Sequence, residues 1–259
     1  MAKRDAKILY TASMLFRAVT AGVAALAVGG YFYAGMWPQS QVFGRTLIAG
    51  NDPDEIALTF DDGPNDGYTE RMLDLLARHE VRATFFVIGR YAREQASLVR
   101  RIREAGHVVG NHTWTHPQLL FRSPARTREE LAATNAALED ILGEKIRYFR
   151  PPYGARRPAV LRMARAMGLV PVLWNVTGYD WKPIPAEGLL RNLENGIWRN
   201  QRRGTGSNLL LHDGGPDGIG EDRSRTLTAT KALLEAWRGK VRFVTVEQWG
   251  ESPGAQSSA

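Results

Sequence analysis

The sequence holds carboxylates and imidazoles whose spacing suits a divalent cation. His112 and His116 are four residues apart, so a helical turn would place both imidazoles on one face. Asp62 would complete three protein ligands, which leaves a coordination position open for water, as in catalytic metal sites. Zinc fits this ligand set, and cobalt, nickel and manganese fit its ligand types too. The alternative is that both histidines cap a helix or form hydrogen bonds in the core.

Asp61 stands directly before Asp62 and is followed by Gly63-Pro64. On a strand the two side chains would face opposite ways, but on a turn both can reach one cavity. With Asp62 on the metal, Asp61 is free to act as general base toward a water whose pKa the metal lowers toward about 7. Taken alone, Asp-Asp-Gly-Pro is also an ordinary turn sequence.

Two further side chains could take part in the same chemistry. His212 ends an apolar segment far along the chain and could protonate a leaving amine. Arg150 could pair with a carboxylate and hold it ionised and oriented. The alternatives are a structural histidine and a surface ion pair.

The elements that must position these residues are short apolar segments alternating with amphipathic ones. Seven segments are expected to be strands: 56–60, 83–89, 107–111, 146–150, 169–174, 208–212 and 242–246. Helices are expected near 68–80, 92–105, 127–142, 155–167, 186–201 and 224–238. Thr127, three residues before Glu130, predicts a capping box on the third of these helices.

Nearly all-apolar strands separated by helices indicate a parallel sheet covered by helices. About seven such units favour a distorted, seven-stranded (β/α) barrel, and no G-x-G-x-x-G follows the first strand to indicate a Rossmann sheet. In barrels of this type chemistry gathers at the C-terminal ends of the strands. The candidate residues all follow strand ends, which places them on one rim.

Five motifs occur in order over about residues 55–250: Thr59-Phe60-Asp61-Asp62-Gly63-Pro64, His112-Thr113-Trp114-Thr115-His116, Arg150-Pro151-Pro152-Tyr153-Gly154, Asp180-Trp181 and Leu209-Leu210-Leu211-His212-Asp213. Together they resemble the NodB-like polysaccharide deacetylases, carbohydrate esterase family 4. The resemblance implies a distorted (β/α) barrel, a bound divalent metal, and removal of N-acetyl groups from chitin oligomers or peptidoglycan.

The resemblance also implies roles for individual residues. The metal ligands would be Asp62, His112 and His116, and the base would be Asp61, held by Arg150. His212 would be the acid, tuned by Asp180. Trp181 and Leu211 would line the acetyl pocket, and the Tyr153 amide would help hold the oxyanion. Thr177 stands where the family pattern D-x-x-D-W has its first Asp.

Two other functions stay open at this point. One is an ester deacetylase that removes O-acetyl groups from a polysaccharide. The other is an inactive glycan-binding protein tethered to a membrane.

The N-terminal segment indicates a membrane location. Residues 18–37 carry no charge, and twenty residues span the roughly 30 Å apolar core of a bilayer. Lys3, Arg4, Lys7 and Arg17 precede this segment, which places the N-terminus in the cytoplasm and the remainder outside. An uncleaved anchor fits better than a signal peptide cut after Ala27, because such a cut leaves an apolar stub.

The expected organisation is therefore an anchor or signal over 1–37, a linker over 38–54, the deacetylase domain over 55–250 and a polar tail over 251–259. The net charge is +7, but no run of basic residues interleaved with aromatics indicates nucleic-acid binding. The pairs Arg100-Arg101, Arg156-Arg157 and Arg202-Arg203 are typical of solvated faces. The expected partners are an acetylated polysaccharide and the membrane, and the absence of cysteine excludes disulfides and thiol catalysis.

Overall fold

The computed structural model describes residues 2–250, and the expected polar tail at 251–259 lies outside the described residues. The sheet is built around β1 (Glu55–Gly63), the longest strand, with β2 (Thr84–Val87) on one edge and β7 (Ser207–His212) on the other. The remaining strands are β3 (Val108–Asn111), β4 (Tyr148–Phe149), β5 (Val170–Pro171), β6 (Val176–Thr177) and β8 (Arg242–Val244).

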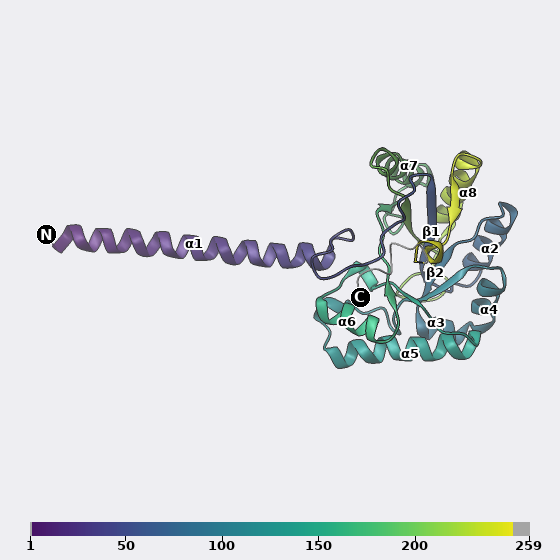
Figure 1. The fold of residues 1–259 in the computed structure, drawn as a ribbon, viewed down its shortest axis with the longest axis horizontal. Helices are drawn as coiled ribbons and strands as arrows, with labels where there is room; N and C mark the ends of the chain where they lie inside the picture. Colours follow the sequence, from purple (N-terminus) through teal and green to yellow (C-terminus); the bar gives the residue numbers. More distant parts are fainter. Residues whose placement is uncertain (1, 251–259) are drawn as a thin grey trace.

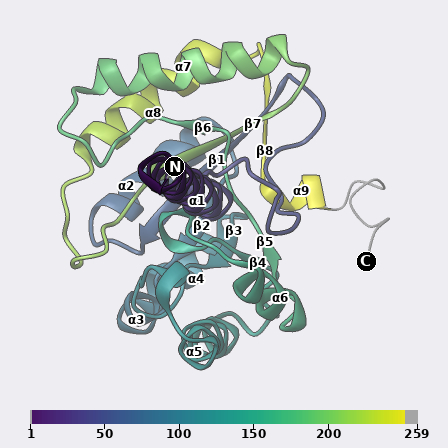
Figure 2. The same cartoon turned by 90° about the vertical axis from the view of Figure 1, so that its left-hand side faces the viewer.

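The strand order is β5-β4-β3-β2-β1-β7-β6, all pairings are parallel, and β8 pairs with the start of β1. The two end strands of this order, β5 and β6, are joined directly by residues 172–175. The sheet therefore curls back on itself, and Figure 2 shows helices arranged around it. The expected distorted (β/α) barrel is confirmed.

The helices cover the outside of the sheet and follow the expected alternation. Their bounds are α1 (Ala2–Met36), α2 (Tyr68–Arg78), α3 (Gly89–Glu94), α4 (Ala96–Glu104), α5 (Pro124–Leu142), α6 (Pro158–Ala166), α7 (Ala186–Arg202), α8 (Ser224–Trp237) and α9 (Val246–Gly250), with short 3-10 helices η1 (Leu119–Phe121) and η2 (Pro152–Gly154).

Two expected elements are each divided in the structure. The segment 169–174 contributes only β5, and β6 begins after it, because residues from the connection before β1 pair in between. There the Leu47 amide donates to the Pro171 carbonyl, and the Leu173 amide donates to the Leu47 carbonyl, both at 2.8 Å. The expected helix 92–105 is the pair α3 and α4, which meet at Gln95.

The α5 helix begins earlier than the sequence suggested. Ser123 is its N-cap, and the Ser123 hydroxyl accepts a hydrogen bond from the Arg126 amide at 3.2 Å. The predicted capping box is therefore wrong: Thr127 donates to the Ser123 carbonyl from inside the helix, and Glu130 bonds elsewhere.

Two apolar clusters occupy the two faces of the sheet. One lies between sheet and helices and includes Leu58, Phe60 and Leu209, and the other lies inside the barrel and includes Ala57 and Phe86. Neighbouring residues of β1 thus alternate between the clusters, as the period of two for a strand requires.

The α1 helix projects away from the barrel and contacts it near its C-terminal end (Figure 1). Its segment Val19–Met36 has a mean hydropathy of 1.4 and is, among residues 2–250, the one helix long and apolar enough to cross a membrane. The connection at 38–54 is irregular, as expected of a linker, but it packs on the barrel through Leu47.

Arg156 corrects the expectation that its arginine pair forms a solvated face. The Arg156 side chain is fully buried. Its guanidinium donates to the carbonyls of Trp37 at 2.8 Å and Ser40 at 2.6 Å, and its amide donates to the Gly35 carbonyl at 2.9 Å. The guanidinium thus ties the chain that follows α1 to the barrel.

Packing of α7 on β6 gives a stability prediction. A Cβ added at Gly196 would lie 2.5 Å from Val176 Cγ1, whereas the nearest such atom to Gly188 in the same helix is 3.7 Å away. Overpacking costs about 1–3 kcal/mol, and alanine gains about 1 kcal/mol over glycine in a helix. We expect Gly196→Ala to lower the thermal unfolding midpoint of the detergent-solubilised chain and Gly188→Ala to leave it equal or higher. An unchanged midpoint for Gly196→Ala would contradict this close contact.

Candidate metal and catalytic site

The two adjacent aspartates are placed by an irregularity at the end of β1. The strand continues through both of them to Gly63, instead of turning before Gly63-Pro64 as expected. Its register with β2 shifts between Asp61 and Gly63, and Asp62 adopts a positive φ of 70°. This β-bulge breaks the alternation of the strand, so both carboxylates reach the same site.

Asp62, His112 and His116 come together as one buried cluster whose ligand atoms all lie within 4.8 Å of one another. One Asp62 oxygen, Oδ1, lies 3.3 Å from His112 Nε2 and 3.1 Å from His116 Nε2. The histidines are held by strained backbone rather than by a helical turn, with φ of 58° at His116 and 68° at Thr113.

The protonation pattern of this cluster fits a cation. His112 Nδ1 lies 2.7 Å from the Arg150 carbonyl oxygen, which can only accept, so Nδ1 carries the proton and Nε2 presents a lone pair to Asp62. Asp62 Oδ1 is buried without a hydrogen-bond partner. Lone pairs that face one another in a buried cluster are what a metal ion satisfies.

Arg150 lies fully buried behind Asp61. Its guanidinium donates to Asp61 Oδ1 at 2.8 Å and to the Thr59 hydroxyl at 2.7 Å, and it lies 4.3 Å from the centre of the Phe86 ring. The second Asp61 oxygen, Oδ2, stays on the side of the metal cluster, 3.7 Å from His112 Nε2. The pairing expected from the sequence is thus present, with the arginine in the barrel interior rather than on the surface.

His212 lies on the opposite side of the cluster, with Nε2 4.0 Å from Asp62 Oδ2. Asp180 receives a hydrogen bond from His212 Nδ1 at 2.8 Å, and its other oxygen accepts from the His212 amide and the Thr226 hydroxyl. Burial alone would lower the pKa of His212, but the Asp180 carboxylate, with Asp62 and Asp61, raises it to about 9. With Nδ1 bonded to Asp180, His212 presents Nε2 to the site.

Two aromatic residues border the site as expected. The Tyr153 ring packs against His116 with centroids 4.7 Å apart, and its backbone has a positive φ of 58°. The Trp181 ring lies edge-on to His212 at 5.4 Å and is 47% exposed.

Leu211 does not lie at the site. It pairs with Phe60 and belongs to the core between sheet and helices, so the expectation that it lines the pocket is corrected. Leu210 pairs with Thr59, whose hydroxyl bonds Arg150, and therefore faces the barrel interior. Counting two residues back from His212 along the strand would have identified it, because side chains alternate between faces.

Glu130 is a buried residue that the sequence did not indicate for the site. One of its carboxylate oxygens accepts from the Thr115 amide and the other from the Thr115 hydroxyl, both at 2.8 Å, and Arg126 pairs with it at 2.9 Å. Thr115 directly precedes His116, so Glu130 holds the loop that carries this imidazole.

Asp213 is a second buried acid near the cluster that no expected role included. Its side chain accepts a hydrogen bond from the Thr69 hydroxyl, and its amide donates to the Asp61 carbonyl at 3.2 Å. Burial, together with the charges of Asp62 and Asp61, raises the pKa of Asp213 to about 7. It supports the end of β1 from behind.

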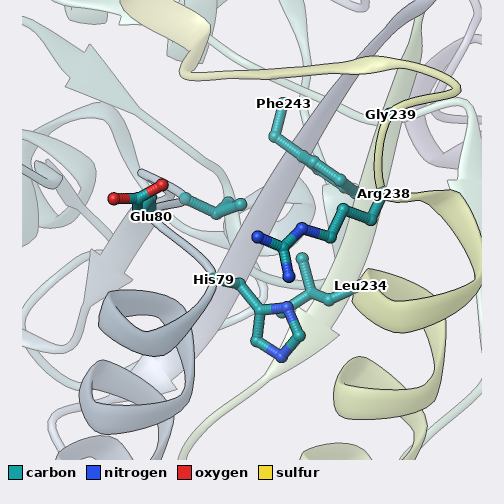
Figure 3. A pocket seen from close by; sticks show the side chains of 7 residues that line it. His79, Glu80, Leu234, Arg238, Gly239 and Phe243 are labelled. Carbon is teal, nitrogen blue, oxygen red and sulfur yellow. The ribbon is translucent and has the colours of Figure 1, made fainter.

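Two cavities differ in their relation to this site. A groove of about 560 Å³ begins beside the site at Trp181 and includes Trp174, Tyr179 and Thr177. A smaller pocket of about 230 Å³ lies where α2 and α8 end, between His79, Arg238 and Phe243 (Figure 3). The groove is lined by Trp181, whose ring contacts His212, whereas no residue of the site lines the smaller pocket.

Comparisons with known proteins agree with this geometry. Residues 49–172 match the family model described as polysaccharide deacetylase. A chitooligosaccharide deacetylase from Azorhizobium caulinodans is 35% identical over 206 residues, covering 77% of this chain and 95% of the relative.

Two solved structures are similar to the fold. A peptidoglycan N-acetylglucosamine deacetylase matches with a TM-score of 0.72 and 31% identity over 79% of this chain and 92% of its own. A family 4 acetyl xylan esterase from Clostridium thermocellum, in complex with a cobalt ion, matches with a TM-score of 0.67 and 32% identity over 77% and 92%.

The role of Glu130 can be tested through metal affinity. In Glu130→Gln one acceptor oxygen becomes an NH₂ group that cannot accept from Thr115, so the His116 loop is held less firmly. We expect cobalt affinity, measured by absorbance titration, to fall by about 10–100-fold, as for other residues that orient ligands. Glu129→Gln is the matched control, because Glu129 pairs with the same Arg126 but is exposed. If Glu130→Gln bound cobalt as tightly as the wild type, the position of the His116 loop would not depend on Glu130.

Proposed function

The chain belongs to the polysaccharide deacetylase family, the NodB-like deacetylases of carbohydrate esterase family 4, and we propose that it removes N-acetyl groups from N-acetylglucosamine-type polysaccharide. The observation that carries the proposal is the buried Asp62–His112–His116 cluster, with Asp61 Oδ2 3.7 Å from His112 Nε2 and His212 Nε2 4.0 Å from Asp62 Oδ2. The relatives named as chitooligosaccharide and peptidoglycan N-acetylglucosamine deacetylases support the choice of sugar.

The proposed metal site consists of Asp62, His112 and His116, with zinc as the resident ion and cobalt, nickel or manganese as substitutes. When bound there, the cation supplies a Lewis acid for the acetyl oxygen and for water. His112 is oriented for this by the Arg150 carbonyl at its Nδ1.

Asp61 and His212 divide the proton transfers. Asp61 Oδ2 accepts the proton of the attacking water, while Arg150 holds Oδ1 in place. His212 gives its Nε2 proton to the departing sugar amine, and Asp180 keeps the imidazole oriented and protonated. The Tyr153 amide takes part in holding the developing oxyanion. Trp181 and, in place of Leu211, Leu210 enclose the acetyl methyl group.

A second substrate chemistry is favoured by one observation. The similar Clostridium thermocellum structure is named an acetyl xylan esterase, so removal of an O-acetyl group is the alternative on the same machinery. An amine must take up a proton to leave, more so than an ester alcohol, so a histidine oriented by Asp180 at this position suits the amide substrate.

We propose that the protein is anchored in a membrane by α1, with the barrel of 55–250 on the extracytoplasmic side. The charges before Val19 orient the helix, and the exposed face of Val19–Met36 matches the span of a bilayer. Retention of the helix is supported by its C-terminal end, because the buried Arg156 guanidinium donates to the carbonyls of Gly35 in its last turn and of Trp37 just after it.

Metal removal tests the whole site. We expect chelation with a strong chelator to abolish acetate release from chitin oligomers, peptidoglycan and acetylated xylan, and re-addition of zinc or cobalt to restore it. Asp62→Asn should stay inactive after re-addition and bind no stoichiometric metal. Activity that survives exhaustive chelation would overturn the metal site, and release from xylan alone would favour the esterase.

Replacement of Asp61 tests the base separately. We expect Asp61→Asn to bind metal normally but to lose about 10²–10⁴-fold in kcat, the usual contribution of a positioned general base. Asp66→Asn is the control, because Asp66 lies on the same loop but is exposed. Full turnover by metal-loaded Asp61→Asn would show that another group takes the proton.

A further inference from the structure

The C-terminal end of α1 and the rim of the site are in contact with the same loop. Residues 19–33 of α1 are exposed, whereas Ala34 is buried. A Cβ added at Gly35 would lie 2.9 Å from the Arg156 carbonyl oxygen, so the helix end packs closely on this loop. Arg156 lies three residues after Tyr153, whose ring packs on the metal-cluster residue His116. The same short loop therefore borders the site and holds the helix. In Figure 2, which looks along α1, the helix projects in front of the middle of the sheet.

Exposed aromatic rings surround this contact between the end of α1 and the barrel. They are Tyr31, Phe32, Tyr33 and Trp37 from the chain around the helix end, and Phe121 from η1. Phe121 is 70% exposed, and its ring lies 6.5 Å from that of Phe32. Aromatic rings at this level of a spanning helix mark the membrane–water interface. The rim of the site thus lies at the membrane surface and not beyond a flexible tether.

The groove beside the site begins next to the C-terminal end of α1. One of its walls is Trp37, Pro38 and Gln39, the residues that directly follow α1, and its other end reaches Trp181 beside His212. Aromatic rings and the amides of Asn175, Asn192 and Asn195 line it. Its volume of about 560 Å³ lies within the usual range for a small-ligand site, and rings with amides suit a sugar.

Two arginines at the C-terminal end of α7, Arg199 within the helix and Arg203 directly after it, give the groove a site for an anion. Arg199 and Arg203 both line it, and neither forms an ion pair with a carboxylate among the described residues. Guanidinium groups bind phosphate through paired N–H donors. A groove that opens at the membrane surface and carries two unpaired guanidiniums suits a phosphate placed between a lipid and a sugar.

We infer that the acetylated sugar this enzyme acts on is carried by a membrane lipid through a phosphate link, an inference that rests on the proposed deacetylase function. The lipid stays in the bilayer beside the end of α1, the phosphate lies at Arg199 and Arg203, and the sugar lies along the groove to Trp181 and His212. Water adds to the acetyl carbon, the C–N bond breaks, acetate leaves and the amine stays on the sugar. The phosphate link is not cleaved.

The test compares three probes with the full-length protein in liposomes. The first is diacetylchitobiose linked through diphosphate to a polyprenyl chain in the same bilayer, the second is the same sugar diphosphate on a short water-soluble alkyl chain, and the third is a neutral chitin oligomer. We expect kcat/KM for acetate release to be at least tenfold higher on the lipid-linked probe than on either soluble one. Equal rates on the lipid-linked probe and the neutral oligomer would overturn the inference while leaving the deacetylase function intact. No acetate from any probe would instead remove the proposed function.

A second variant tests the distance between the bilayer and the site by lengthening the segment between them. Four apolar residues followed by twelve Gly/Ser residues, inserted after Phe32, keep a spanning segment and leave the contacts of Ala34–Ser40 with Arg156 in place. Twelve flexible residues let the rim move about 19 Å from the bilayer. We expect the preference for the lipid-linked probe to be lost and the rate on the neutral oligomer to be retained. An insertion variant that keeps the preference would contradict the inference.

The arginines are tested by charge reversal. In the double variant Arg199→Glu, Arg203→Glu we expect kcat/KM on both phosphate-bearing probes to fall at least tenfold relative to the neutral oligomer. Arg202→Glu is the matched control, because Arg202 is exposed on the same helix but does not line the groove. A loss of only the lipid-linked activity would assign the arginines to the bilayer surface, and an unchanged ratio would exclude a phosphate at this position.

Discussion

The site depends on one buried guanidinium. Arg150 lies at the centre of the barrel mouth, where its side chain bonds Asp61 and Thr59 of β1 and approaches Asn208 of β7, while its own carbonyl fixes the tautomer of His112. Removing one partner of such a buried pair costs about 3–5 kcal/mol, because the other charge is left uncompensated. A single residue therefore couples the position of the proposed base to the orientation of a metal ligand, and the barrel mouth is ordered around it.

The second constraint is backbone strain placed at the same rim. Apart from Glu80, the non-glycine residues with positive φ among residues 2–250 all lie there: Asp62, Thr113, His116, Tyr153 and Tyr179. Such conformations cost on the order of 1–3 kcal/mol each and persist only where the surroundings fix them. Glu130 supplies this support for His116, and Asp213 supplies it for the end of β1. Polar residues buried behind the site thus hold a geometry that an isolated loop would not keep.

The sequence predicted the parts of this arrangement that are local. Apolar strands ending in Asp, His and Arg were enough to predict the barrel and the cluster of Asp62, His112 and His116 on one rim. The rest depends on contacts between distant segments: Leu47 pairs within the expected strand 169–174 and divides it, and Glu130, which fitted a capping box locally, bonds Thr115 instead. Arg156 shows the same limit, since nothing in the pair Arg156-Arg157 indicates that one guanidinium is buried against carbonyls more than a hundred residues earlier.

The burial of Arg156 changes what the N-terminal helix contributes to the molecule. A helix that only attached the domain to a membrane would need a long enough connection and no contacts with the barrel. Here the carbonyls of Gly35 and Trp37, at and just after the end of α1, accept from a guanidinium that has no access to water, so removing residues before Ser40 would leave part of this buried donor group unpaired. The helix end is therefore part of the folded barrel, and the loop that binds it also carries Tyr153 at the site. The position of α1 and the shape of the active-site rim are, in this chain, consequences of the same hydrogen bonds.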